Sequence, residues 1–337
     1  MASPLIEIEK KKIGFGYPTY FIAEAGLNHN GNVKIAKKMV QGACNAGADA
    51  IKFQTYKTEE SLTESSQYFK FFKDVELSYE EFAEIKDYSK SVGITFFSSP
   101  FDIESASFLK KIRVPCFKIA SSDMTNIPLL KHVARMNLPM LISTGLATIH
   151  EIDEAVNSCM LEGNSKIALL HCVADYPARP EEVNLAAIES MRKRFNMPIG
   201  YSDNGESPLV DLIAVSMGAN LIEKHFTLNK KMRGPDHSFS IEPKGLRNLI
   251  SQIRLVEIMK GDGIKSPKPS EVRNKFAIRK SVTATRKIMK GEILSKEKLA
   301  IKRPAEGIEP KYLEEIIGKV VKKNVDKDMP MKWSDLK

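Results

Sequence analysis

The stretch at residues 221–240, LIEKHFTLNKKMRGPDHSFS, brings together the residue types that acid–base and ligand chemistry requires. A short apolar run ends in Glu223, Lys224 and His225, and a basic loop then leads to Asp236 and His237. A carboxylate, an ammonium and an imidazole at the tip of one strand are costly to bury without partners. At the C-terminal ends of parallel strands, such groups are typical of the active sites of α/β proteins.

Seven more apolar, strand-like runs end in polar residues, and with residues 220–227 they make eight: 19–26, 48–56, 94–100, 116–123, 140–145, 166–172 and 197–203. Strands enclosed in a barrel should be apolar along their length, so polar tips indicate a site at the C-terminal mouth. His171 lies between Leu170 and Cys172. Taken alone, it is interpreted as a core residue whose ring nitrogens form hydrogen bonds within the protein. The other polar tips are Glu24, Lys52, Gln54, Ser98, Ser99, Lys118, Ser121, Asp123, Ser143, Thr144, Ser202 and Asp203.

The stretches between these runs have helical periodicity, and two of them open with capping-box signatures, Ser78 with Glu81 and Thr148 with Glu151. Eight β/α repeats within about 260 residues predict a (β/α)8 TIM barrel. A doubly wound open sheet is the alternative, but no GxGxxG motif follows the first strand.

The pattern changes near residue 262, where prolines and polar residues indicate a linker. We therefore predict a barrel domain at residues 1–262, a linker at 263–278 and a small β-rich domain at 279–337. The longest connection within the barrel, Lys57–Leu77, contains several aromatic residues. It could be a lid or binding loop, or it could form a small satellite core, and the sequence favours neither.

The net charge of +9 lies entirely in the C-terminal part of the chain. Residues 1–261 contain 31 Lys and Arg against 31 Asp and Glu, whereas residues 262–337 contain 20 against 11. The basic part lacks the interleaved aromatic residues of a nucleic-acid surface, so we expect no nucleic-acid partner. No apolar run is long enough for a membrane span, and four scattered cysteines without a CxxC pair indicate reduced thiols and a cytoplasmic protein.

The composition of the predicted rim indicates two kinds of substrate. Lysine ammoniums and serine hydroxyls are suited to a phosphate and a carboxylate. The carboxylates could bind sugar hydroxyls or a metal ion, or act as acid and base. One anionic and one polyhydroxylated substrate would satisfy both sets.

Motifs in the same order resemble those of the sialic acid synthases: AEAGLNHNG (23–31), KFQT (52–55), SSPFD (98–102), FKIASSD (117–123), STG (143–145), YP (176–177), GYSD (200–203), EKHFTL (223–228) and GPDH (234–237). The segments IRKSVTA, KGEIL and KRPAEG resemble the antifreeze-like (SAF) domain of that family. The resemblance covers nearly the whole chain. It implies a transferase that condenses phosphoenolpyruvate with an N-acetylmannosamine-type sugar to a nonulosonic acid, with C–O cleavage and release of phosphate, for polysaccharide biosynthesis. It also implies a homodimer in which the SAF domains are swapped.

The resemblance further implies roles for individual residues. Glu24 would handle a proton near the sugar aldehyde. The residues implied for phosphoenolpyruvate are Lys52, Ser99, Lys118, Ser121, Ser143 and Ser202. Those implied for the sugar are Gln54, Asp123, Tyr176, Asp236 and Arg303, with Arg303 supplied by the partner. His225 and, weakly, Asn204 would bind a divalent metal, Mn2+ or Mg2+.

Three positions depart from the family pattern. Asn204 stands where the family has its second metal-binding histidine, so we expect a weaker metal site. Ser121, Ser122 and Asp123 replace a serine-glycine-glutamate sequence, which shortens the carboxylate by one methylene. Ala174 replaces an asparagine that contacts phosphoenolpyruvate in some relatives.

Two other functions are compatible with parts of the pattern. A Schiff-base aldolase on the same barrel would use Lys118 or Lys224 and would need a neutral lysine. A non-catalytic carbohydrate- or nucleic-acid-binding protein would use the basic C-terminal domain, but it would not require the polar strand tips. Within the synthase interpretation, N-acetylmannosamine and a 6-deoxy 2,4-diacetamido analogue are both open as the sugar. We expect the residues that distinguish them on the Lys57–Leu77 connection.

Overall fold

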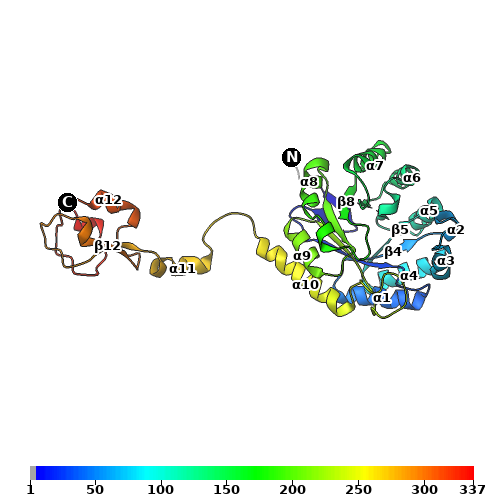
Figure 1. The fold of residues 1–337 in the computed structure, drawn as a ribbon, viewed down its shortest axis with the longest axis horizontal. Coiled ribbons are helices and arrows are strands. Elements are labelled where there is room, and N and C mark those ends of the chain that lie inside the picture. The colour runs from blue at the N-terminus through cyan, green and yellow to red at the C-terminus, as the bar shows by residue number, and fades with distance from the viewer. Residues whose placement is uncertain (1–4) are drawn as a thin grey trace. The chain divides into compact units, whose positions relative to one another are not determined.

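The computed structural model describes residues 5–337, which divide into a unit that ends at Gly261 and a unit at Asp262–Lys337 (Figure 1). In the first unit, eight parallel strands close into a barrel in the order β10-β3-β4-β5-β6-β7-β8-β9. The strands are β3 (Tyr20–Gly26), β4 (Ala50–Thr55), β5 (Thr95–Pro100), β6 (Phe117–Ile119), β7 (Met140–Ser143), β8 (Ile167–Cys172), β9 (Ile199–Asp203) and β10 (Leu221–His225). Each lies within a predicted run, so the predicted (β/α)8 barrel is confirmed.

Helices surround these strands as the repeat pattern predicts (Figure 1). Both predicted capping boxes form. The Ser78 hydroxyl accepts from the Glu81 amide at 3.2 Å, while the Ser78 amide donates to the Glu81 carboxylate at 2.8 Å. The helices are α1 (Val33–Ala46), α4 (Tyr79–Val92), α5 (Ile103–Lys111), α6 (Ile127–Arg135), α7 (Ile149–Leu161), α8 (Ala186–Phe195), α9 (Pro208–Ser216) and α10 (Pro243–Lys260).

An N-terminal hairpin, β1 (Leu5–Ile8) and β2 (Lys11–Gly14), closes the end of the barrel at which the strands begin. This hairpin was not predicted from the sequence. Its buried residues Ile6, Ile8 and Ile13 belong to one apolar cluster with Tyr20 and Leu221, which begin their strands. The N-terminal ends of the strands are therefore packed with apolar side chains, and polar chemistry is confined to the opposite end.

The second unit is small and built mainly from short antiparallel pairings, as predicted. Strands β11 (Ser281–Ala284) and β12 (Leu299–Lys302) form a two-stranded sheet, and isolated bridges such as Ile288 with Val325 extend the pairing. Helix α12 (Leu313–Ile316) contributes to its apolar core, and helix α11 (Pro269–Ile278) lies within the segment predicted as a linker. Among residues 5–337, no helix has the length and apolar character needed to cross a membrane.

Candidate active site

A cavity of about 920 Å³ lies at the C-terminal ends of the barrel strands. That volume is typical of sites that enclose a small ligand. Predicted site residues from every strand except β8 reach it directly, because alternate residues of each strand point into the barrel. Those that line it are Glu24, Lys52, Gln54, Ser99, Lys118, Ser121, Ser143, Tyr176, Ser202, Asn204, His225 and Asp236.

Four buried charges of alternating sign form the floor of the cavity. The Lys52 ammonium lies 2.9 Å from Glu24 Oε2 and 3.6 Å from Glu223 Oε1. The Lys118 ammonium lies 3.8 Å from the same Glu223 oxygen and donates to the Ile119 carbonyl at 3.0 Å. Two positive and two negative groups thus compensate one another, which matters because an uncompensated buried charge is strongly destabilising. From the sequence, Glu223 was one of the carboxylates that could bind sugar hydroxyls or a metal ion, or act as acid and base; in the structure it joins the two lysines.

The environment separates the pKa values of like groups in this floor. Burial raises the pKa of Glu24 despite the nearby Lys52 ammonium. Burial acts in the same direction on Glu223, but Lys118 and Lys52 outweigh it and lower the pKa of that carboxyl. For the lysines, burial lowers the pKa of Lys118, whereas Glu223 and Glu24 overcome burial and raise the pKa of Lys52. Glu24 and Lys118 are therefore the floor groups whose pKa values are shifted toward neutrality.

Next to this floor, serine hydroxyls line the cavity on the side formed by β6, β7 and β9. Ser143 Oγ is buried without a hydrogen-bond partner within residues 5–337, and Ser202 Oγ donates to Glu223 Oε1 at 3.1 Å. Ser121 Oγ accepts from the Gly145 amide at 3.1 Å. A Cβ on Gly145 would lie 2.7 Å from that hydroxyl, so the glycine of the STG motif makes room for Ser121. With the Lys118 ammonium beside them, these hydroxyls can bind anionic oxygens.

The loop after β10 places Asp236 in the cavity and uses His237 as its anchor. The two His237 ring nitrogens lie 2.7 Å from Thr227 Oγ1 and 3.3 Å from Asn30 Oδ1. His237 therefore ties this loop to the loop after β3, whereas Asp236 lines the cavity next to His225. The two histidines of this stretch thus have different surroundings, because His237 holds the loop in place whereas His225, which the resemblance assigns to a metal, lines the cavity.

Asp123, one of the residues predicted for the sugar, does not line the cavity. Asp123 lies in a short 3₁₀ turn, and its carboxylate accepts from Ser122 Oγ and Asn126 Nδ2, each at 3.0 Å. Its place on the lining is taken by Ser122. Arg303 belongs to the second unit, where it precedes Pro304.

Several other polar residues at the strand ends are bonded to neighbouring protein groups and have a structural role. The Lys224 ammonium is buried between Asp203 and Asp211 and donates to the Gly205 carbonyl at 3.0 Å. These carboxylates outweigh burial and raise the pKa of Lys224, so it remains charged. A ring nitrogen of His171 lies 2.7 Å from the Val183 carbonyl oxygen, as expected for a satisfied core histidine.

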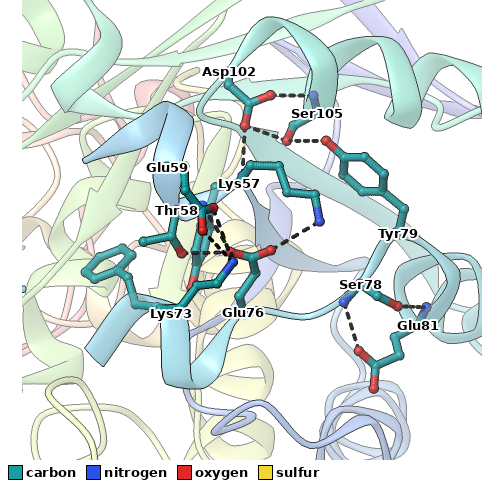
Figure 2. A network of polar contacts seen from close by, with 12 residues as sticks. Lys57, Thr58, Glu59, Lys73, Glu76, Ser78, Tyr79, Glu81, Asp102 and Ser105 are labelled. Atoms are coloured by element: carbon teal, nitrogen blue, oxygen red, sulfur yellow. Dashed lines mark hydrogen bonds and ion pairs between the residues drawn. The ribbon is translucent and has the colours of Figure 1, made fainter. Parts of the chain in front are cut away.

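The connection Lys57–Leu77 is folded rather than extended, with helices α2 (Thr58–Ser61) and α3 (Phe69–Val75). Figure 2 shows the Glu76 carboxylate holding its two ends together. Glu76 accepts from the Thr58 amide at 3.0 Å, the Thr58 hydroxyl at 2.8 Å and the Lys57 ammonium at 3.1 Å. The Lys57 amide in turn donates to Asp102 at 3.0 Å, which fixes the connection to the start of α5.

The same connection carries aromatic side chains to the cavity. Leu27, Tyr56 and Val75 form a small buried cluster, against which Phe71, Phe72 and Phe101 pack. Tyr68, Phe71 and Phe72 also line the cavity. Both interpretations left open by the sequence are therefore realised in part, because the segment forms a satellite core and also one wall of the cavity.

His225 and Asn204 offer a partial ligand set for the divalent cation that the resemblance implies. His225 Nδ1 is buried without a hydrogen-bond partner within residues 5–337, and burial lowers the pKa of its ring, which keeps a lone pair available. The Asn204 amide nitrogen donates to the Val173 carbonyl at 2.7 Å, so its oxygen is the atom left for a cation. Both residues follow paired positions of β9 and β10.

The space beside His225 is bounded by carboxylates. A Cβ on Gly26 would lie 3.2 Å from Asp236 Oδ2 and 3.6 Å from both Glu24 Oε1 and His225 Cε1. Glycine thus leaves open the volume that these groups surround. No group of three His, Cys, Asp or Glu residues in the described part of the chain is arranged to hold a metal by itself. These donors therefore fit a hard cation only if water or substrate supplies the remaining ligands.

Fold and cavity together define a (β/α)8-barrel protein with a buried ionic site at its strand ends. The sequence profile of the NeuB family matches residues 39–265, and that of the SAF domain matches residues 279–337. The chain therefore belongs to the NeuB family and carries a C-terminal SAF domain, which confirms the resemblance seen in the sequence.

Individual relatives match along nearly the whole chain. An uncharacterized protein of Methanocaldococcus jannaschii is 46% identical over 331 residues, or 98% of each chain. The N,N'-diacetyllegionaminic acid synthase of Campylobacter jejuni is 40% identical over 326 residues, 92% of this chain and 98% of the relative. The crystal structure of the N-acetylneuraminic acid (sialic acid) synthetase of Leptospira borgpetersenii matches with a TM-score of 0.78 and 38% identity over 81% of this chain and 95% of that one.

The charge balance of the floor can be tested by stability. Lys52→Met should lower the free energy of unfolding by about 3–5 kcal/mol, because it leaves Glu24 and Glu223 buried with too little positive charge. Adding Glu24→Gln should recover part of that loss, giving a coupling energy above about 1 kcal/mol. Urea unfolding followed by circular dichroism reports on the barrel helices, whereas fluorescence of Trp333 reports on the second unit.

Lys70→Met is the matched control, because Lys70 forms an exposed ion pair with Asp74 and should change stability by less than about 0.5 kcal/mol. Additive effects of the two floor substitutions would show that the buried charges do not depend on one another.

Proposed function

We propose that this protein is a nonulosonic acid synthase that condenses phosphoenolpyruvate with an N-acetylmannosamine-type aldehyde sugar and water, releasing phosphate. The observation that carries the proposal is that the buried ammoniums of Lys52 and Lys118 line the same cavity as several serine hydroxyls. That combination suits a small trianion bearing a phosphate and a carboxylate. The rest of the cavity leaves room for a second, larger substrate. The names of the relatives in Campylobacter and Leptospira support the same reaction class.

In this reaction the C3 carbon of phosphoenolpyruvate attacks the sugar aldehyde, and water adds to the C2 carbon. Phosphate then leaves with cleavage of the C2–O bond. Lys118 would bind the anion. The bound negative charge should restore the full positive charge of Lys118, because an anion opposes the effect of burial on the pKa of this lysine. Glu24 would exchange the proton of the developing hydroxyl, since burial raises its pKa, which is the direction that general acid–base work by a carboxyl requires. Gln54, which donates to Glu24 Oε1 at 3.2 Å, would orient that carboxyl.

Lys118 has a lowered pKa, and this single feature favours the Schiff-base aldolase as a second candidate. Lys224 cannot serve that role, because Asp203 and Asp211 hold it charged. For Lys118, the hydrogen bond to the Ile119 carbonyl and the neighbouring Glu223 favour the ammonium over a neutral nucleophile. We therefore assign Lys118 to anion binding.

The bond that breaks also separates a synthase, which cleaves the C2–O bond of phosphoenolpyruvate, from a phosphatase or phosphotransferase, which would cleave the O–P bond. With phosphoenolpyruvate labelled by 18O at the bridging oxygen, a synthase should deliver all the label to phosphate and none to the sugar acid. Phosphate should form only when an aldehyde sugar is present, because the enol needs its electrophile. Mass spectrometry of both products measures the distribution.

Borohydride treatment with pyruvate is the control, and it should leave Lys118 unmodified. Label retained in the sugar acid, sugar-independent phosphate release at a comparable rate, or a trapped Lys118 adduct would each contradict the synthase.

We also propose that His225 and Asn204 hold Mn2+ or Mg2+, which would polarise or orient the sugar aldehyde when bound. An amide oxygen is a weaker ligand than an imidazole for later transition metals, so chelators should remove the ion readily. Added Mn2+ or Mg2+ should restore activity, and Asn204→His should lower the Kd for Mn2+ by about tenfold or more. Calorimetric titration with Mn2+ alone measures this affinity.

His225→Ala is the matched control for that titration and should abolish specific Mn2+ binding. Full activity of chelated, metal-free enzyme would contradict the metal proposal.

We further propose a cytoplasmic homodimer with a shared active site, on the basis of the family resemblance and the four free cysteines. Arg303 of one subunit would bind the sugar held by the other, so Arg303→Ala should raise the KM for the sugar by tenfold or more, with little effect on phosphoenolpyruvate. Lys302→Ala, at the neighbouring position, is the control and should leave both values within about twofold.

Mixing Arg303→Ala with Lys118→Ala protein should restore part of the activity, because each hybrid dimer would contain one intact composite site. A mixture that stays inactive after verified subunit exchange, or full activity of a chain ending near Ile264, would contradict the shared site.

A further inference from the structure

A buried ion pair lies behind the cavity, on the outer face of the barrel, and the proposed reaction does not use it. The Lys224 ammonium contacts the Asp203 carboxylate and lies 3.5 Å from Asp211 Oδ2 on α9. All three residues are at most 1% exposed. Because alternate residues of a strand point to opposite faces, Asp203 and Lys224 point toward the helices. Their neighbours along the two strands line the cavity: Ser202, Asn204, Glu223 and His225.

The layer between the barrel and its helices is otherwise apolar at this point. Tyr201 and Ile222, which are also outward-facing residues of β9 and β10, belong to the main hydrophobic core. Charges buried in such a layer lose their hydration, and apolar side chains of similar volume are often as stabilising as a buried ion pair or more so. Stability alone therefore does not explain why Asp203 and Lys224 are charged.

Both members of the pair bond to the turn that follows β9. The Gly205 amide donates to Asp203 Oδ1 at 2.7 Å, and the Lys224 ammonium donates to the Gly205 carbonyl at 3.0 Å. A Cβ on Gly205 would lie 3.1 Å from Asp203 Oδ1, so the carboxylate packs closely against the turn. Asn204 lies between Asp203 and Gly205 in the chain. The pair therefore fixes the backbone on both sides of Asn204.

The bond from Lys224 to the turn continues the connection between β9 and β10 where their backbone pairing stops. The register of these strands ends with Lys224 opposite Asp203. The next residue of β10, His225, is still held by its pairing with β3. Asn204 follows the last paired residue of β9, and the Lys224–Gly205 bond ties its turn to β10. The distance between Asn204 and His225 thus depends on a side chain rather than on the strand ladder.

We propose, on the basis of the cation site included in the proposed function, that Asp203 and Lys224 are a positioning pair for that site. From outside the barrel they hold the turn that presents Asn204 opposite His225, and they contact neither the cation nor a substrate. Groups that orient metal ligands in this way commonly change metal affinity by about 10–100-fold when they are removed. The pair thus connects the helix layer, through Asp211, to the geometry of the cation site.

Calorimetric titration with Mn2+ alone should compare wild-type protein with Lys224→Met/Asp211→Asn. The double variant removes one positive and one negative charge, so the net buried charge is unchanged while the Gly205 carbonyl loses its donor. Its Kd for Mn2+ should rise by about tenfold or more. The Kd for phosphoenolpyruvate should stay unchanged. The Gly205 amide should exchange its hydrogen faster than in the wild type, as measured by NMR.

Asp211→Asn alone is the matched control. Both Asp211 carboxylate oxygens lack a hydrogen-bond partner within residues 5–337, so this change leaves the two bonds to Gly205 in place. It should alter neither the Kd for Mn2+ nor the exchange of the Gly205 amide. Gly205→Ala is a second variant that keeps all three charges but presses a methyl group against Asp203. It should also raise the Kd for Mn2+.

An unchanged Kd for Mn2+ in both the double variant and Gly205→Ala would overturn the positioning pair. Equal losses of affinity for Mn2+ and phosphoenolpyruvate would do the same, because they would show a general loosening of the barrel. If circular dichroism shows that the double variant does not fold, the result for Gly205→Ala decides. Absence of specific Mn2+ binding by the wild type would refute the cation site, and this inference with it, without contradicting the condensation reaction.

Discussion

The compensation of four buried charges, Glu24, Lys52, Glu223 and Lys118, is the constraint on which the rest of the barrel depends. These residues come from β3, β4, β10 and β6, and each must point inward for the charges to meet. A shift of one residue in any of these strands would place a charge against the surrounding helices. The ionic floor therefore specifies strand register as well as chemistry, which apolar side chains of similar volume could not do as sharply.

Isolation from water allows the pKa values of the floor residues to shift away from their ordinary values. The N-terminal hairpin and the strand starts fill the barrel below it, and Phe71, Phe72 and Phe101 cover one side above it. Two carboxyls a few ångströms from the same ammonium then have pKa values shifted in opposite directions, upward for Glu24 and downward for Glu223. In water such neighbours would titrate alike. An anion bound near Lys118 would change this balance, so proton transfer can be coupled to substrate binding.

The barrel and most of its site were predictable from sequence because apolar runs and polar tips are local patterns. Lys52 and Gln54 are two residues apart, so a strand must point both the same way. The failures concern the backbone beyond the strands. Asp123 immediately follows a polar tip, but a 3₁₀ turn directs its carboxylate to Asn126. The N-terminal hairpin depends on long-range packing against strand starts such as Tyr20, which no local signal encodes. The path of Lys57–Leu77 depends on Glu76, whose partners are defined only after folding.

The closed strand order also constrains where two substrates can meet. Ser121, Ser143 and Ser202 belong to the segments from β6 to β9, whereas Phe71, Phe72 and Phe101 follow β4 and β5, and a boundary between these two groups falls where β10 pairs with β3. Glu24 and His225 are paired residues at that boundary, and Asp236 lies beside them. In the proposed reaction, an anion bound by these serines and a sugar beside these phenylalanines would bring their reactive carbons together at this boundary. The proposed acid–base group, Glu24, and the proposed cation ligand His225 would therefore lie where that reaction needs them, because of strand order rather than loop sequence.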